Sequence, residues 1–334
     1  MLNKNLFFSF FLAIIAAFLV ISCNQQQVET PDKSQTKSTP NFQVAMVAPG
    51  SKTDQSWSQA GYEGLNLIEK KFQAKTFYQE YVSEAESETL MRNYAQENYD
   101  FIIGHSGSYI AAAEIVAEEF PRTKFALVTT YPGNNSNLGA VAFRSGEVGY
   151  LTGLLAAMKT KSNKVAYLVG EDYPVYQEEA ALFKRGAEAT NPSVEVFTEI
   201  LGTWTDEEKA TQVALNLLAE GVDIFAFNAD EAGVAAIEAV TAKENVYVIG
   251  WTKDQYEIAP GHILTSVLQD IPQLVLNAAT LMQQGRWEGK LYKFGLKEKI
   301  YDFAPFRGML TPEEEAAFNT ARNQVTIGKI DISP

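Results

Sequence analysis

The chain has 334 residues, a formal net charge of -14 at pH 7 and 46% hydrophobic residues. The acidic balance argues against nucleic acid or an anionic lipid surface as a partner, because both require basic protein surface. After a polar segment near the N-terminus, the rest of the chain has no second low-complexity break. It is long enough for two lobes of ordinary domain size, roughly 100 to 200 residues each.

Residues 1–22 predict a signal peptide, because a single charge at Lys4 precedes an almost unbroken apolar run from Leu6 to Ile21. A short membrane anchor is the alternative. The run stops at Val20-Ile-Ser-Cys23, which contains the one cysteine of the chain. This ending resembles the lipobox of bacterial lipoproteins and implies cleavage before Cys23 and diacylation of its sulfur, as in palmitate-modified lipoproteins. A secreted protein with an incidental cysteine is the other interpretation.

Residues 23–40 are expected to form a flexible tether. From Asn24 to Pro40 the segment consists mostly of Gln, Ser, Thr, Lys and Pro. Such a composition cannot bury enough apolar surface to fold. The folded part therefore begins near residue 41.

The folded part opens with the strand pattern Phe42 to Ala48. Asp54 then stands at the position of a helix N-cap, and apolar residues follow at intervals of three and four from Trp57 onwards. This spacing predicts a helix that packs on a sheet. Trp57 lies in its first turn, where the ring either projects over the strand ends or packs in the core.

Strand and helix patterns then alternate through residue 129, which predicts a parallel sheet with right-handed crossovers. Gly104-His-Ser-Gly-Ser108 directly follows one of these strands. It is close to the nucleophile elbow Gly-x-Ser-x-Gly, but Ser108 replaces the last glycine, and the second of the two histidines, His262, is distant in the sequence. We therefore interpret residues 104–108, including His105, Ser106 and Gly107, as a binding loop.

A second α/β unit begins at Lys164 and contains the clearest strand, helix, strand segment of the chain, from Asp223 to Gln255. Polar or aromatic residues follow both of its strands, Asp230 after the first, and Trp251 and Asp254 after the second. In open α/β sheets ligands bind at this edge of the sheet. Capping of the following helix is the alternative role of Asp230.

Several stretches form a pattern by their order and spacing: residues 54–64, Gly104-His105, Phe143-Arg144 with Gly149-Tyr-Leu-x-Gly153, Gly202-Thr-Trp204, Asp254-Gln255 and Ile263-Leu-Thr-Ser266. Together they resemble the basic membrane protein family, the substrate-binding lipoproteins of ABC importers for purine nucleosides and related compounds. The resemblance covers nearly all of the chain after the tether.

This resemblance implies the type I periplasmic-binding-protein fold, an α/β fold whose two Rossmann-like lobes contain parallel sheets and are joined by a three-strand hinge. Residues 41–144 with 263–288 would form the N-terminal lobe, and residues 145–262 with 289–334 the C-terminal lobe. A ligand would bind in the cleft between them.

The implied ligand is a purine nucleobase or nucleoside, and the implied partners are an ABC permease and its ATPase subunits. A lipid-anchored monomer on the extracytoplasmic side of the cell membrane is expected, with no catalytic residues, metal or cofactor. Tryptophans that follow predicted strands are suited to stack on a base, and nearby polar side chains to meet its edge. The candidate ligand-binding residues are Asp54, Gln55, Trp57, His105, Ser106, Gly107, Phe143, Trp204, Asp230, Trp251 and Asp254.

Three departures from the family pattern affect the expected ligand. Thr252 stands where the purine-nucleoside receptors have an acidic residue, Gln269 where they have a lysine, and an aspartate is missing near Ala111. In those receptors the charged groups hold the ribose hydroxyls, so their absence disfavours a nucleoside and favours a free planar base.

Two other classes of protein remain as alternatives, a nucleoside-processing hydrolase and a surface lipoprotein or adhesin without a solute. The sequence has no closely spaced His, Asp and Glu ligands, no Walker loop, and no Gly-x-Gly-x-x-Gly after a strand. This pattern favours binding over catalysis.

Overall fold

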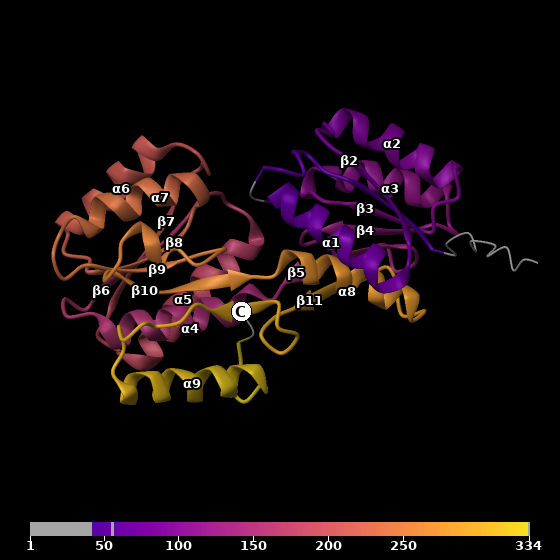
Figure 1. The fold of residues 1–334 in the computed structure, drawn as a ribbon. Coiled ribbons are helices and arrows are strands. Elements are labelled where there is room, and N and C mark those ends of the chain that lie inside the picture. The colour runs from indigo at the N-terminus through magenta and orange to yellow at the C-terminus, as the bar shows by residue number, and fades with distance from the viewer. Residues whose placement is uncertain (1–41, 55–56, 333–334) are drawn as a thin grey trace, which may run out of the picture. The chain divides into compact units, whose positions relative to one another are not determined.

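The computed structural model describes residues 42–54 and 57–332. The signal peptide, Cys23 and the tether lie outside these residues, as does Gln55. The described chain contains two six-stranded sheets, each covered by helices (Figure 1). Within it, no helix has the length and apolar character needed to cross a membrane.

The first sheet has the order β11-β5-β4-β3-β1-β2, and all of its strands pair in parallel. Its strands are β1 (Gln43–Val47), β2 (Lys75–Gln79), β3 (Phe101–Gly104), β4 (Lys124–Val128), β5 (Leu138–Phe143) and β11 (Leu291–Phe294). The helices that cover it are α1 (Trp57–Phe72), α2 (Glu84–Gln96), α3 (Ile110–Glu119) and α8 (Ile271–Gln283), with the short 3-10 helix η1 (Gly107–Tyr109) before α3.

Side chains of the first sheet alternate between two cores, because successive residues of a strand point to opposite faces. Val44 and Met46 of β1 pack with α1 and α8, whereas Ala45 and Val47 pack with α2 and α3. Both faces are therefore apolar, as expected for a parallel sheet between two helical layers.

The second sheet has the order β12-β10-β9-β8-β6-β7, with β12 antiparallel to β10. Its strands are β6 (Lys164–Val169), β7 (Glu195–Ile200), β8 (Ile224–Asn228), β9 (Tyr247–Gly250), β10 (Ile263–Gln269) and β12 (Tyr301–Phe303). Its helices are α4 (Ser145–Lys159), α5 (Pro174–Thr190), α6 (Glu207–Ala219), α7 (Asp230–Thr241) and α9 (Pro312–Thr326), with the 3-10 helix η2 (Tyr256–Ile258). Helices α6 and α7 cover one face and α4 and α5 the other (Figure 1).

The glycines of the α4–α5 interface allow the two helices to approach closely. A Cβ atom at Gly153 would lie 1.9 Å from the carbonyl oxygen of Phe183, and one at Gly186 would lie 2.0 Å from that of Tyr150. The small-residue pattern of α4 in the sequence thus reflects helix packing.

The α/β class with two parallel-dominated sheets is confirmed, but the segments divide between the sheets differently from the ranges expected. The expected ranges place β10 in the N-terminal lobe and β11 in the C-terminal lobe, but β10 pairs with β9 in the second sheet and β11 pairs with β5 in the first. An apolar strand has the same sequence pattern in either sheet, so the sequence did not distinguish them. The chain crosses between the sheets three times, after β5, after β10 and after β11.

Candidate functional site

A cavity of about 780 Å³ lies at the carboxyl ends of strands from both sheets. Its volume is in the range of small-molecule sites, roughly 300–1,000 Å³. The first sheet and its helices contribute Trp57, Ser106, Gly107, Ser108, Ile110, Val128, Thr129, Thr130, Val141, Ala142, Phe143, Ile271 and Leu274. The second sheet and its helices contribute Tyr173, Pro174, Val175, Tyr176, Glu179, Trp204, Asn228, Asp230, Thr252, Gln269 and Tyr301.

Six of the candidate residues taken from the sequence line this cavity, namely Trp57, Ser106, Gly107, Phe143, Trp204 and Asp230. They come together because the strands of a parallel sheet end at one edge, and the loops that follow them share that edge. The loop after β3 thus contributes Ser106, Gly107 and Ser108, and the loop after β7 contributes Trp204.

Trp57 is fixed in the cavity wall by His105. The two rings stack with centroids 4.5 Å apart and planes 16° apart, and the Trp57 indole Nε1 donates a hydrogen bond of 2.9 Å to the His105 carbonyl oxygen. One face of the indole is therefore covered by protein, and the ring is only partly buried. A ring held in this way is suited to stack on a planar ligand with its other face.

His105 itself is fully buried, so the expectation that it meets the ligand is wrong for this structure. Its Nε2 donates to the Trp57 carbonyl oxygen at 2.8 Å, which fixes the tautomer because a carbonyl oxygen only accepts. Burial lowers the pKa of His105 to about 4, so the ring is neutral at pH 7. Gly61 makes room for it, since a Cβ there would lie 2.6 Å from the imidazole. His105 positions Trp57.

Three further candidates, Asp54, Asp254 and Trp251, lie away from the cavity. The Asp54 carboxylate accepts hydrogen bonds from the backbone N–H groups of Ser58 and Gln59, at 3.1 and 2.9 Å, and so caps α1. The Asp254 carboxylate forms an ion pair with Arg307.

Trp251 is 2% exposed and packs in the core against Tyr167, with ring centroids 5.9 Å apart. Trp251 directly follows β9, but its ring turns inward and packs in the core of the second sheet. The prediction that Trp251 lines the cleft is therefore wrong for this structure.

Asp230 lies in the first turn of α7 and makes no side-chain cap bond, because Ala229 occupies the N-cap position. The alternative that Asp230 caps the helix is thus not seen. Its backbone φ is 41°, in the left-handed region. Burial raises the pKa of the Asp230 carboxyl group, because the group lies in the concave wall of the cavity. Water nevertheless still reaches the side chain. Asp230 is available to a ligand.

The aromatic wall is larger than the tryptophans alone suggested. Tyr176 packs edge-on against Trp204, with centroids 5.5 Å apart, and Tyr301 lies 5.1 Å from Phe143. Trp204 in turn rests on Gly170, where a Cβ atom would come within 2.2 Å of its ring. Together with Trp57, these rings make much of the cavity wall aromatic.

A buried polar cluster in the cavity wall was not among the candidates taken from the sequence. Glu179 of α5 accepts hydrogen bonds from the Tyr167 hydroxyl and from Asn228 Nδ2, the latter at 2.8 Å. Glu179 stands on the apolar face of α5, at helical spacing from Leu182, Phe183 and Gly186, which are all buried. The sequence signal that could have revealed this cluster is an acidic residue at a position of α5 where helical spacing predicts burial.

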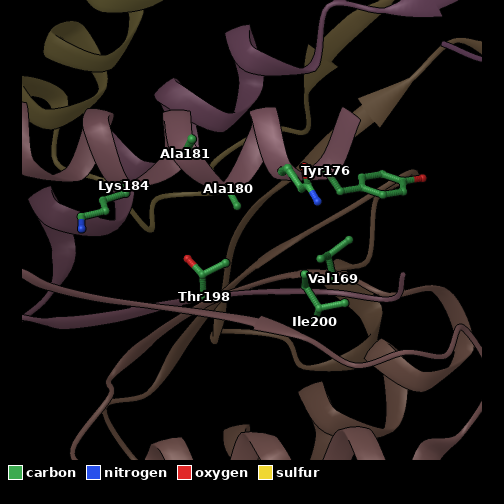
Figure 2. Close-up of a pocket in the computed structure, with 8 residues that line it drawn as sticks. Val169, Tyr176, Ala180, Ala181, Lys184, Thr198 and Ile200 are labelled. Atoms are coloured by element: carbon green, nitrogen blue, oxygen red, sulfur yellow. The ribbon is translucent and has the colours of Figure 1, made fainter. Parts of the chain in front are cut away.

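A second, smaller cavity of about 270 Å³ lies between α5 and the strands β6 and β7. Figure 2 shows Tyr176 and Lys184 of α5 across from Val169, Thr198 and Ile200 of the strands. It is smaller than the usual range of small-molecule sites, and apolar or aromatic residues form most of its lining. The larger cavity is therefore the candidate site. Among the described residues, no three His, Cys, Asp or Glu side chains are grouped as metal ligands.

Known relatives match almost the whole folded part. The chain is 27% identical over 295 residues to "Basic membrane protein A" of Borreliella afzelii, covering 84% of this chain and 88% of that protein. It is 25% identical to "Transcriptional activator protein med" of Bacillus subtilis, covering 88% of this chain and 89% of the relative.

Solved structures show the same fold. A transcriptional activator of the comK gene from Bacillus halodurans has a TM-score of 0.74 at 23% identity, covering 87% of this chain and 99% of that one. An ABC transporter solute-binding protein from Aeropyrum pernix has a TM-score of 0.69 at 20% identity, covering 87% and 92%. The family model "ABC transporter substrate-binding protein PnrA-like" matches residues 42–333, and the chain therefore belongs to this Bmp family of substrate-binding proteins.

Proposed function

We propose that this protein binds a purine nucleobase or nucleoside and delivers it to the permease of an ABC importer. Membership of a substrate-binding family carries the transport role. The observation that supports the purine is the cavity of about 780 Å³, whose lining includes Trp57 and Phe143 from the first sheet and its helices and Tyr176 and Trp204 from the second. Aromatic side chains in a cavity wall suit a planar heterocycle, because its ring can stack on theirs.

The energetics agree with a heterocyclic ligand. Stacking of an aromatic side chain on a base contributes about 1–3 kcal/mol per base and is tolerant of the base's identity. Two rings that stack from opposite sides would supply a large part of the roughly 8 kcal/mol of a micromolar complex. Polar groups in the cavity wall would then distinguish one purine from another.

The polar wall favours a free base over a nucleoside within this proposal. Thr252 and Gln269 line the cavity and carry no charge. At these two positions the family pattern has charged groups that hold ribose. Without charged groups at these two positions, fewer groups remain to bind a sugar, so we expect the free base to bind more tightly than the nucleoside.

Membrane attachment through Cys23 is the second part of the proposal. Its support is the position of the chain's one cysteine directly after an apolar N-terminal run. Diacylation of the sulfur would hold the protein on the extracytoplasmic face of the cell membrane as a monomer, next to the permease and its ATPase subunits. Cys23→Ala should abolish partition into detergent, and a variant that still partitions would contradict the anchor.

Mass spectrometry of small molecules released from purified, denatured protein is the most direct test of the ligand. Isothermal titration with adenine, guanine, hypoxanthine and their nucleosides then gives the affinities. We expect at least one purine to be retained or to bind in the micromolar range. Glucose and an amino acid serve as control solutes. If no purine binds and an unrelated solute is released, the proposal of a purine ligand is refuted.

A further inference from the structure

Glu179 is an acidic side chain in the wall of the cavity that no role assigned above explains. It lies in the second turn of α5 and is only 1% exposed, yet it contributes to the cavity lining. A buried carboxyl group is costly unless it is hydrogen-bonded or neutral. Its contacts therefore define what it can do.

One oxygen of Glu179 is occupied by protein. Oε1 accepts from the Tyr167 hydroxyl on β6 and from Asn228 Nδ2 at the end of β8, the latter at 2.8 Å. Two donors from two neighbouring strands fix the carboxyl group in one orientation. Such a group is pre-organised, since no side-chain freedom is lost when a ligand arrives.

The other oxygen of Glu179 has no partner in the part of the protein that the structure describes. Among the described residues, no side chain or backbone group forms a hydrogen bond with Glu179 Oε2. Among the same described residues, two buried side-chain polar atoms have no hydrogen-bond partner, and these are His105 Nδ1 and Trp251 Nε1. Glu179 Oε2 is not one of them. Because Glu179 is one of the residues that line the cavity, the small exposed part of its side chain faces the cavity.

The protonation state follows from the surroundings. Burial raises the pKa of Glu179 to about 8, and the two hydrogen bonds to Oε1 lower it only in part. The carboxyl group is therefore mainly protonated at pH 7. Because Oε1 already accepts two hydrogen bonds, the proton resides on Oε2, where it makes an O–H donor.

No cation in the described structure pairs with Glu179. The titratable groups that face it are Tyr167 on β6, Tyr301 on β12, and Tyr176 and Glu178 on its own helix. Lys293 of β11 pairs with Glu178 at 2.7 Å. Helix α4 meets the Glu179 backbone through a glycine. These neighbours favour the neutral acid.

We infer that Glu179 determines specificity in the cleft by donating a hydrogen bond from Oε2 to an acceptor, a ring nitrogen or a carbonyl oxygen, on an uncharged ligand. This inference rests on the proposed function, because a purine carries such acceptors at its ring edge. A neutral Glu179 offers no charge of its own to a cationic ligand. A ligand without such an acceptor leaves the Glu179 donor unsatisfied, which weakens its binding.

Isothermal titration at pH 7 and pH 9 tests the inference, with the tightest-binding member of the panel of adenine, guanine, hypoxanthine and their nucleosides. For a pKa of about 8, the protonated fraction falls from about 0.9 to about 0.1 over this range, so wild-type affinity should fall about tenfold. Glu179→Gln keeps a donor and an acceptor but does not titrate. Its affinity should change only as far as the ligand itself titrates.

Glu188→Gln is the matched control, because Glu188 is an exposed residue of the same helix. It should show the full wild-type fall between the two pH values. A wild-type affinity that is equal at pH 7 and pH 9, or a fall of the same size in Glu179→Gln, would overturn the role of Glu179 while leaving purine binding intact. Absence of binding by every purine at both pH values would instead refute the proposed function, and this inference with it. The wild-type series decides even if the variant does not fold.

Discussion

Replacement of Trp57 by alanine is the sharpest test of where the ligand binds. One face of the indole lies on His105 at 4.5 Å, which leaves a single face to stack on a base. Loss of one stacking contact costs about 1–3 kcal/mol, and one face places the estimate in the lower half of that range. We expect Trp57→Ala to weaken purine binding about tenfold, equivalent to about 1.4 kcal/mol.

The same substitution should also destabilise the ligand-free protein. It removes the hydrogen bond from Trp57 Nε1 to the His105 carbonyl oxygen and uncovers the His105 ring. We expect a loss of about 1–2 kcal/mol in the free energy of unfolding, less than for a fully buried tryptophan, because Trp57 is partly exposed.

Calorimetric titration of the folded variant separates these two effects. Trp57→Phe keeps an aromatic face and should recover most of the affinity but not the lost hydrogen bond. Trp287→Phe is the matched control, since Trp287 is buried away from the cavity against Phe101. It should alter stability alone. Wild-type affinity in a folded Trp57→Ala protein would show that the ligand does not stack on this ring.

Three further predictions follow from the same contacts. The pKa of His105 is lowered to about 4 in the folded protein, so on acidification the unfolded chain takes up this proton at a higher pH than the folded chain. The free energy of unfolding, measured by denaturant titration, should therefore fall by roughly 3 kcal/mol from about pH 6.5 to pH 4. The fall should be smaller in His105→Asn than in a His262→Gln control. Gly170→Ala should displace the Trp204 ring and weaken purine binding severalfold in calorimetry, but should add nothing in a Trp204→Ala background; additive losses would contradict that coupling. Saturating purine should raise the melting temperature and reduce the radius of gyration in small-angle scattering, because a ligand that contacts both lobes favours the closed state; an unchanged radius would count against closure.

Local sequence patterns were sufficient to predict the α/β class and several of the loops that line the cavity. Alternation of apolar runs with helical spacing identifies parallel strands and covering helices, since each pattern reflects which faces are buried. The same rule places loops at one sheet edge, and it correctly brought Ser106, Gly107, Trp204 and Asp230 to the cavity. Each of these predictions depends on neighbouring residues in the chain.

Which sheet a strand joins and which way a side chain turns were decided only by tertiary structure. Strands β10 and β11 carry apolar patterns that suit either sheet, and hydrogen-bonded partners far away in sequence assign them. His105 and Trp251 both follow strands, yet each turns inward, because stacking with Trp57 in one case and core packing in the other buries the ring.

Glu179 illustrates the same limit from the opposite direction. On its own helix it is one acidic residue among several, and its neighbours Glu178 and Glu188 lie in ordinary ion pairs. Tyr167 and Asn228, from two strands, convert it into a fixed carboxyl group at the cavity wall. Periodicity along the chain reveals burial, whereas the chemistry of a buried group depends on the long-range neighbours that replace its water.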